Sequence, residues 1–86
     1  MAALAPLARG EFQSGLEAYQ RGDYAAALEA WLPVAERGDA NAQYNVGLLY
    51  ARGEGIPQDL ALAAEWYRKA AEQGVAAAQH NLAVIH

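Results

Sequence analysis

The sequence predicts an all-α protein in which about five helices stack as antiparallel pairs into an α-solenoid. Alanine, the residue with the highest helix propensity, accounts for 22 of the 86 residues, whereas the strand-favouring valine and isoleucine number only four and two. A 25-residue pattern recurs 36 residues later, a spacing typical of stacked helical hairpins. Glycines at matching places divide the chain into runs of helical length.

The internal repeat aligns residues 23–47 with residues 59–83, and 11 of the 25 positions are identical. The identical pairs are Asp23/Asp59, Ala25/Ala61, Ala27/Ala63, Glu29/Glu65, Ala35/Ala71, Glu36/Glu72, Gly38/Gly74, Ala40/Ala76, Ala42/Ala78, Gln43/Gln79 and Asn45/Asn81. Trp31 and Tyr67 conserve bulk between the two copies. A second match, with an offset of 31, relates Leu16-x-x-Tyr19-x-x-Gly22 to Gly47-x-x-Tyr50-x-x-Gly53. This offset is five residues shorter than 36, which predicts that the loop of the second unit is longer than that of the first by five residues.

Helix boundaries follow from capping residues. The predicted helices span residues 7–21, 24–36, 40–52, 60–73 and 76–85. Gly22, Gly38, Gly53 and Gly74 follow these runs, where a left-handed residue ends a helix, and Asp23, Asp39 and Asp59 stand at N-cap positions. The short connections make neighbouring helices antiparallel. Pro33 lies inside the second helix, where we expect a kink and not a break, because the apolar pattern continues beyond it.

The second unit carries a long motif. It reads Gly47-Leu48-Leu49-Tyr50-x-x-Gly53-x-Gly55-Ile56-x-x-Asp59, then Ala63-Ala64-x-Trp66-Tyr67-x-Lys69-Ala70-Ala71-Glu72-Gln73-Gly74, then Ala78-Gln79. This pattern resembles the Sel1-like repeat family, a relative of the tetratricopeptide (TPR) repeat, over residues 39–79. The family usually has Lys-Ala at Ala63-Ala64 and Val at Ile56. The resemblance implies a right-handed superhelix.

The units divide the chain into four segments. Residues 1–8 are a leader, interpreted as a signal-peptide remnant, vector-derived sequence or the lead-in to the first helix. Residues 9–38 form a first hairpin with the short loop of a plain TPR unit. Residues 39–74 form a second, full Sel1-like repeat, and residues 75–86 form the first helix of a truncated third repeat.

The motif residues have architectural roles. We expect Gly47 and Ala63 to let two helices cross closely, and Ile56 to fold under its hairpin. Tyr50, Trp66 and Tyr67 are expected to fill the space between hairpins. Asn45 and Asn81, which recur at the 36-residue offset, are expected to bridge backbone groups of neighbouring hairpins.

Charge and composition exclude several function classes. The net charge is −4, the isoelectric point is about 4.9, and the six basic residues are scattered, which argues against nucleic-acid and anionic-membrane binding. The absence of cysteine excludes disulfides and thiolate metal sites. No apolar run has the length of a membrane-spanning helix, so we expect no membrane insertion. Sel1-like arrays occur in bacterial cytoplasmic and envelope proteins, so the compartment stays open.

The sequence shows no group of residues in a pattern typical of a catalytic site. His80 and His86 lie six residues apart on one helix and do not share a face, so we expect no metal pair. Ser14 is the only serine, and there is no threonine. The carboxylates are explained by caps and solvated faces, including an i,i+4 pair of Glu65 with Lys69. We therefore predict no enzyme, no cofactor and no metal; a hydrolase is the least favoured alternative.

The resemblance implies a protein-binding scaffold. In TPR-like solenoids the first helix of each hairpin lines a concave groove, which suits an extended peptide of a protein partner. The corresponding positions are Gln13, Glu17 and Arg21, then Asn41, Tyr44, Leu48 and Arg52, then His80 and Val84.

An alternative hypothesis is assembly. Leu82, Val84 and Ile85 of the last predicted helix form an apolar face, and exposed apolar faces tend to find partners. We therefore also expect that the chain can form a homodimer through this helix, acting as a structural module.

Overall fold

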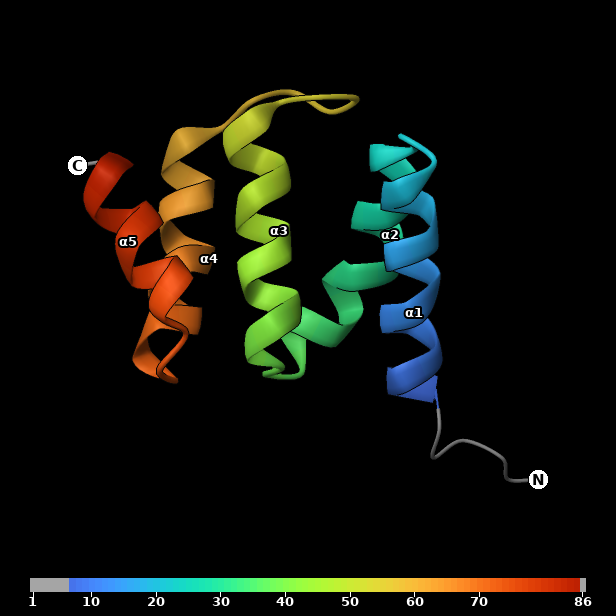
Figure 1. The fold of residues 1–86 in the computed structure, drawn as a ribbon, viewed down its shortest axis with the longest axis horizontal. Coiled ribbons are helices and arrows are strands. Elements are labelled where there is room, and N and C mark those ends of the chain that lie inside the picture. The colour runs from blue at the N-terminus through green and yellow to red at the C-terminus, as the bar shows by residue number, and fades with distance from the viewer. Residues whose placement is uncertain (1–6, 86) are drawn as a thin grey trace.

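Five α-helices make up the part of the chain described by the computed structural model, which covers the backbone of residues 7–85 and the side chains of residues 10–85. They are α1 (Leu7–Gln20), α2 (Tyr24–Glu36), α3 (Ala40–Arg52), α4 (Leu60–Glu72) and α5 (Ala76–Ile85) (Figure 1). Each predicted boundary lies within one residue of the observed one. Residues 7 and 8 of the predicted leader belong to α1, and its first six residues lie outside the described part.

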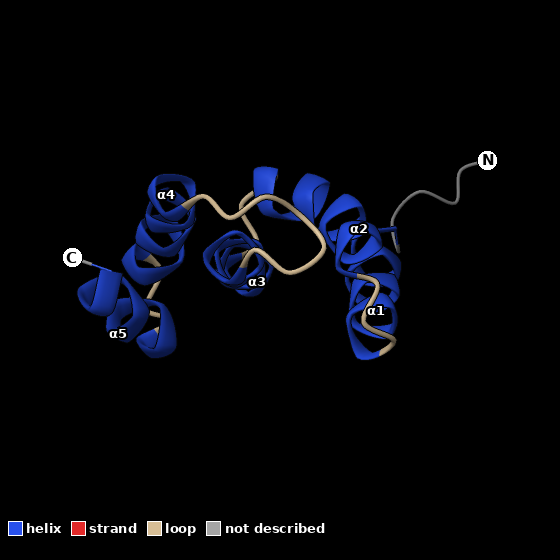
Figure 2. Ribbon diagram, turned by 90° about the horizontal axis from the view of Figure 1, so that it is seen from above, coloured by secondary structure: helices blue, strands red, loops and turns tan. Residues whose placement is uncertain are grey.

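The helices form two rows. Each helix packs chiefly against its neighbours in sequence, and the molecule is elongated, with extents of 46 × 27 × 17 Å. Seen from above, α1, α3 and α5 lie along one side and trace a shallow arc, while α2 and α4 lie along the other (Figure 2). We call the side formed by α1, α3 and α5 the concave face. This arrangement confirms the predicted all-α solenoid of sequential helix pairs.

The caps lie where the sequence predicts them. The Oδ1 atoms of the three aspartates accept hydrogen bonds from the backbone N–H three residues on, at 3.2 Å for Asp23, 2.9 Å for Asp39 and 3.0 Å for Asp59. The glycines that end the helices have positive φ angles of 82° (Gly22), 106° (Gly38), 67° (Gly53) and 97° (Gly74). Such angles cost glycine nothing but strain other residues, so these positions fix the turns.

Pro33 does not end α2. The helix continues to Glu36, and the residues after the proline, Val34 and Ala35, are buried. The expectation that Pro33 does not break the helix is therefore confirmed. Burial of the two side chains holds the last turn in place, although the proline removes the N–H that would bond to the carbonyl of Glu29.

The core has two clusters, each built around one aromatic residue of the repeat. Trp31 is the largest buried side chain of the first cluster, which joins α1, α2 and α3, and Tyr67 is the corresponding residue of the second cluster, which joins α3, α4 and α5. The indole N–H of Trp31 donates to the carbonyl of Phe12 at 3.0 Å. Most other buried residues are alanines, which let the helices lie close together.

Glycines allow both aromatic rings to lie against a neighbouring helix backbone. A β-carbon at residue 47 would stand 2.7 Å from Cδ1 of Tyr67 and 3.2 Å from the carbonyl oxygen of Ala63. This confirms the predicted close crossing at Gly47 and Ala63. A β-carbon at Gly15 would overlap the indole of Trp31 in the same way, a contact that the sequence reasoning did not anticipate.

The longer loop of the second unit folds back onto the first hairpin. Figure 1 shows it reaching from the α3 end across toward α2. Ile56 packs, half-buried, against the first core cluster, which confirms its predicted role. Gly55 lies beside the side chain of Tyr24, and the N–H of Asp59 donates to the carbonyl of Tyr50 at 2.9 Å. The loop therefore joins the two units.

Glutamines, not asparagines, bridge to the backbone. The amide nitrogens of Gln43 and Gln79 donate to the carbonyls of Ala35 and Ala71, each at 3.2 Å, so the bridge repeats with the 36-residue period. The expectation for Asn81 was wrong, because its position on α5 turns its amide toward two tyrosine hydroxyls. Asn45 makes no side-chain hydrogen bond within the described residues.

Candidate functional site

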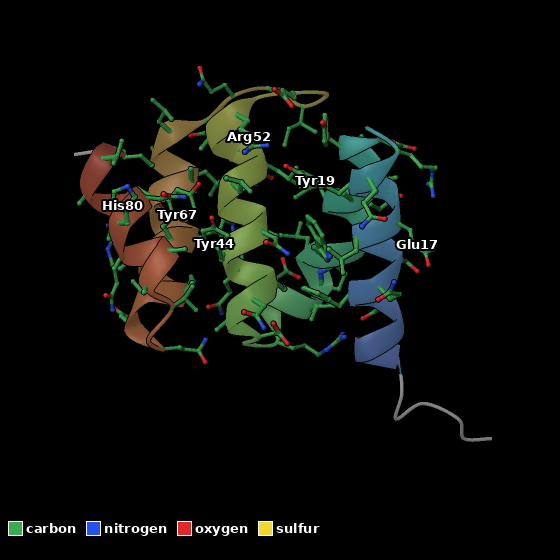
Figure 3. The ribbon with its side chains drawn as sticks, in the orientation of Figure 1. Glu17, Tyr19, Tyr44, Arg52, Tyr67 and His80 are labelled. Atoms are coloured by element: carbon green, nitrogen blue, oxygen red, sulfur yellow. The ribbon has the colours of Figure 1, made fainter. Side chains whose placement is uncertain are left out.

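The predicted groove residues occupy equivalent positions on α1, α3 and α5. Gln13, Tyr44 and His80 correspond through the two repeat offsets, as do Glu17, Leu48 and Val84. Tyr44 and Leu48 are half-buried, and the other seven residues of the set are exposed. Figure 3 shows the concave face toward the viewer and labels Glu17, Tyr44, Arg52 and His80 of this set. They do not form one continuous cluster, because Glu17 lies on the side of α1 turned away from α3.

The first meeting point lies between α1 and α3. The guanidinium of Arg52 donates a hydrogen bond to the hydroxyl of Tyr19, 33 residues earlier in the chain. The Tyr19 ring lies 5.1 Å from that of Tyr24 and 5.9 Å from that of Trp31, between centroids. Desolvation, and then the nearby carboxylate of Glu54, raises the pKa of Tyr24. Arg52 is therefore held toward α1 by an aromatic cluster, while its side chain stays exposed.

The second meeting point lies between α3 and α5. The amide nitrogen of Asn81 donates to the hydroxyls of Tyr44 and Tyr67, at 3.5 Å and 3.4 Å. The two tyrosine rings lie 5.8 Å apart between centroids. Burial raises the pKa of Tyr67, although the hydrogen bond from Asn81 opposes this shift. Three helices thus contribute to one polar group at the bottom of the concave face.

A pocket of about 200 Å³ lies beside this polar group. It is lined by Ala51, Tyr67, Asn81, Val84 and Ile85, which come from α3, α4 and α5. Of these, only Val84 was a predicted groove residue, and sequence reasoning missed the pocket. One signal was present: the second unit has the small Ala51 where the first unit has Gln20.

The predicted self-association residues differ in exposure. Val84 has 70% of its surface exposed, but Leu82 and Ile85 are half-buried and pack against the second core cluster. The apolar face of α5 is therefore smaller than the sequence suggested, because the preceding hairpin covers two of its three residues.

Charged groups join the helices at the edges of the molecule. Arg37, after α2, forms an ion pair with Glu11 of α1. The predicted pair of Glu65 and Lys69 does not form; the Lys69 ammonium lies 5.7 Å from the centroid of the Trp66 ring instead, a cation–π contact. Among the described residues, no three side chains of the metal-binding types gather, and His86 lies outside that part. Ser14 and His80 lie on α1 and α5, at opposite ends of the solenoid.

None of the helices that the structure describes is both long enough and apolar enough to cross a membrane.

Comparison with known proteins identifies the family to which the second unit is similar. Residues 40–75 match the family model described as Sel1 repeat. DAP3-binding cell death enhancer 1 of Rattus norvegicus is 47% identical over 49 residues, which are 57% of this chain and 10% of that protein. The ERAD-associated E3 ubiquitin-protein ligase component HRD3B of Arabidopsis thaliana is 38% identical over 52 residues, covering 57% of this chain and 9% of that protein. The chain spans about a tenth of the length of these relatives.

A solved structure matches almost the whole chain. The crystal structure of a Sel1 repeat protein from Oxalobacter formigenes superposes with a TM-score of 0.80 at 35% sequence identity. The match covers 95% of this chain and 36% of the other. The fold predicted from the repeat and the resemblance drawn from the motif are both confirmed.

Proposed function

The chain belongs to the Sel1 repeat family, and we propose that it is a scaffold whose concave face binds an extended peptide segment of a protein partner. Sel1 repeats are non-catalytic modules that mediate protein interactions, so a binding role needs no chemistry beyond the side chains described above. The relatives named as a DAP3-binding protein and as a ligase-complex component fit such a role. Those relatives are much longer than this chain, so the partners in their names are not assigned to it.

The observation that carries the proposal is the fixed placement of polar groups on the concave face. Arg52 is held by Tyr19, and Tyr44 is held by Asn81, so each is positioned by a residue from another helix. A side chain that is already ordered loses less conformational entropy when a ligand binds. An extended peptide offers backbone N–H and C=O groups along its length, which such polar groups recognise.

Charge favours a neutral or acidic peptide. The predicted groove residues of α3 and α5 include Arg52 and His80 but no carboxylate, although the chain as a whole carries a charge of −4. Of the acidic residues, Asp23, Asp39 and Asp59 are helix caps, Glu54 lies in the loop, and the other six belong to α1, α2 and α4, so α3 and α5 carry none. A peptide with acidic side chains therefore meets attraction from Arg52 and no carboxylate along α3 and α5, and repulsion from the carboxylates of the other helices.

Selection of peptides tests the proposal. Random peptides displayed on phage are selected on the immobilised chain, and the affinity of the enriched peptides is measured by calorimetry. Arg52→Glu is expected to weaken binding about tenfold or more, because it removes a positioned cation and adds repulsion. Arg68→Glu on α4 is the matched control, since Arg68 is also exposed and the charge change is identical. Equal loss for both variants, or loss for neither, contradicts binding at the concave face.

A second candidate function is self-association through α5. Val84 on α5 and Leu60 at the start of α4 are exposed by 70% and 48%. The repeat counterparts of Leu82 and Ile85, which are Val46 and Leu49, are fully covered by neighbouring helices, so this kind of surface is buried elsewhere in the same solenoid.

Sedimentation velocity over a range of concentrations tests self-association. The dimer is expected to dissociate on Val84→Lys but not on Ala77→Lys, a change at another exposed position of α5. A monomer at all concentrations refutes this second candidate.

A further inference from the structure

We infer that the pocket between α3 and α5 binds a single uncharged aliphatic side chain of the bound peptide, and so gives the concave face its sequence preference. The inference rests on the proposed function, because it names the part of the partner that the concave face selects. Four observations support it: the size of the pocket, its apolar walls, the polar group beside it, and the lack of charge in its lining.

The size of the pocket fits one side chain. Its volume of about 200 Å³ is below the range of roughly 300–1,000 Å³ typical of sites for small-molecule ligands. Such a volume suits one branched or linear aliphatic side chain better than a cofactor or a metabolite. Val84, one of its lining residues, is exposed at a predicted groove position of α5, so a peptide that lies across α3 and α5 contacts the edge of the pocket.

The aliphatic part of the pocket lining comes from α3 and α5. The methyl group of Ala51 forms the α3 side, and Val84 and Ile85 form the α5 side. Val84 is one of the most exposed large apolar residues of the chain, at 70%. Seating an aliphatic side chain against it removes apolar surface of both partners from water, at about 25 cal/mol per Å².

The polar group beside the pocket matches a peptide backbone. Asn81 uses its amide N–H groups on the hydroxyls of Tyr44 and Tyr67, which leaves its carbonyl oxygen as an acceptor and each hydroxyl proton as a donor. A peptide backbone carries an N–H and a C=O on either side of every side chain. The side-chain carbonyl of Asn81 can accept a hydrogen bond from the peptide N–H, and the hydroxyl of Tyr44 can donate one to the peptide C=O.

The pocket lining disfavours the binding of a charged ligand side chain. None of the five lining residues is ionised at neutral pH, and Tyr67, whose pKa is raised, remains protonated. A lysine or aspartate side chain entering the pocket leaves water without gaining an opposite charge, which is unfavourable. An aliphatic side chain carries no such cost.

A nuclear magnetic resonance titration of the 86-residue chain tests the inference with two small probes. The first is N-acetyl-leucine N′-methylamide, an aliphatic side chain between two peptide groups, and the second is N-acetyl-glycine N′-methylamide, which lacks the side chain. Saturable shifts of the Ala51, Val84 and Ile85 methyl signals are expected with the leucine probe and not with the glycine probe. Absence of saturation, or equal shifts with both probes, overturns the inference.

A variant that fills the pocket provides a second test of the inference. Ala51→Leu places an aliphatic side chain where the ligand is expected, and both residues favour helix. Ala51→Leu is expected to lower the affinity for the leucine probe at least tenfold. The control Ala61→Leu, at an exposed position of α4, is expected to keep the affinity within twofold of wild type. Unchanged affinity in Ala51→Leu overturns the inference, because an occupied pocket then binds as well as an empty one.

The outcomes separate this inference from the function on which it rests. Selected peptides that lose affinity with Arg52→Glu but bind Ala51→Leu like wild type leave the concave face as the binding site and refute the pocket. A leucine probe that saturates at the pocket while no peptide depends on Arg52 supports the pocket and refutes the proposed binding along the wider concave face.

Discussion

Gly47 lies against the ring of Tyr67, and a β-carbon on residue 47 would stand only 2.7 Å from Cδ1 of that ring. Tyr67 is 1% exposed and has core residues around it, so the ring has little room to move. The close approach of α3 and α4 therefore depends on the absence of a side chain at this position. The same relationship joins Gly15 of α1 to Trp31 of α2.

Gly47→Ala is predicted to lower the free energy of unfolding by about 1–3 kcal/mol, because overpacking outweighs the gain in helix propensity. Gly10→Ala is the matched control: it lies in α1 with no atom within 4 Å of an added β-carbon, and it should stabilise by up to about 1 kcal/mol. Urea unfolding followed by circular dichroism measures both. Equal stability of the two variants would show that Tyr67 does not require a glycine opposite it.

Asp59→Ala is predicted to destabilise the chain by about 1 kcal/mol, because the Oδ1 atom that accepts from the N–H of Leu62 is lost. Asp59→Asn keeps a capping oxygen and should cost less. The difference between the two variants in urea unfolding isolates the cap. If alanine and asparagine behave alike, the hydrogen bond at 3.0 Å does not stabilise α4.

Alkaline pH is predicted to destabilise the chain through Tyr67. Burial raises its pKa in the folded state, whereas the unfolded state has the ordinary value of about 10. Above that pH the unfolded state releases the proton first, so the contribution to stability is complete below about pH 10 and is lost as pH rises toward the folded-state pKa.

Tyr67→Phe removes this titration, so its free energy of unfolding should fall less steeply between pH 9 and 11. Urea unfolding at several pH values gives the two slopes. Tyr24, whose pKa is also raised, contributes to the slope in both proteins and does not affect the comparison. Identical slopes would mean that the Tyr67 hydroxyl is no harder to ionise in the folded state.

Tyr44→Phe is predicted to weaken peptide binding while changing stability little. The variant keeps the ring contact with Tyr67 at 5.8 Å but removes the hydroxyl that Asn81 holds on the concave face. A loss of about fivefold to tenfold corresponds to one hydrogen bond of about 1 kcal/mol. Calorimetry with a selected peptide, together with the urea midpoint, separates the two effects. A large fall in stability would show instead that the hydroxyl is structural.

The fold could be predicted from the sequence because its signals are local. An aspartate cap and a left-handed glycine lie within a few residues of the helix ends that they fix, as at Asp59 and Gly53. Because the unit is repeated, most of these signals occur twice in the chain. Trp31 and Tyr67 were recognised as equivalent bulky residues for the same reason, and both are buried.

The site could be predicted only in part. The repeat offsets located the exposed positions of α1, α3 and α5, but not the pairs that form between helices. Arg52 with Tyr19, and Asn81 with Tyr44, are separated by 33 and 37 residues, and their contacts depend on the curvature of the solenoid and on side-chain rotamers. The sequence does not specify either quantity, so Tyr19, Ala51, Tyr67 and Asn81 were missing from the predicted set.

Mapping a bound peptide onto the chain tests the central claim most directly. Amide chemical shifts of the labelled 86-residue chain are recorded while a selected peptide is added to saturation. Binding at the concave face predicts the largest shifts at exposed and half-buried residues of α3 and α5, such as Asn41, Tyr44 and His80, and small shifts at Ala61 and Arg68 of α4. Largest shifts on α2 and α4, with the concave face unchanged, would contradict it.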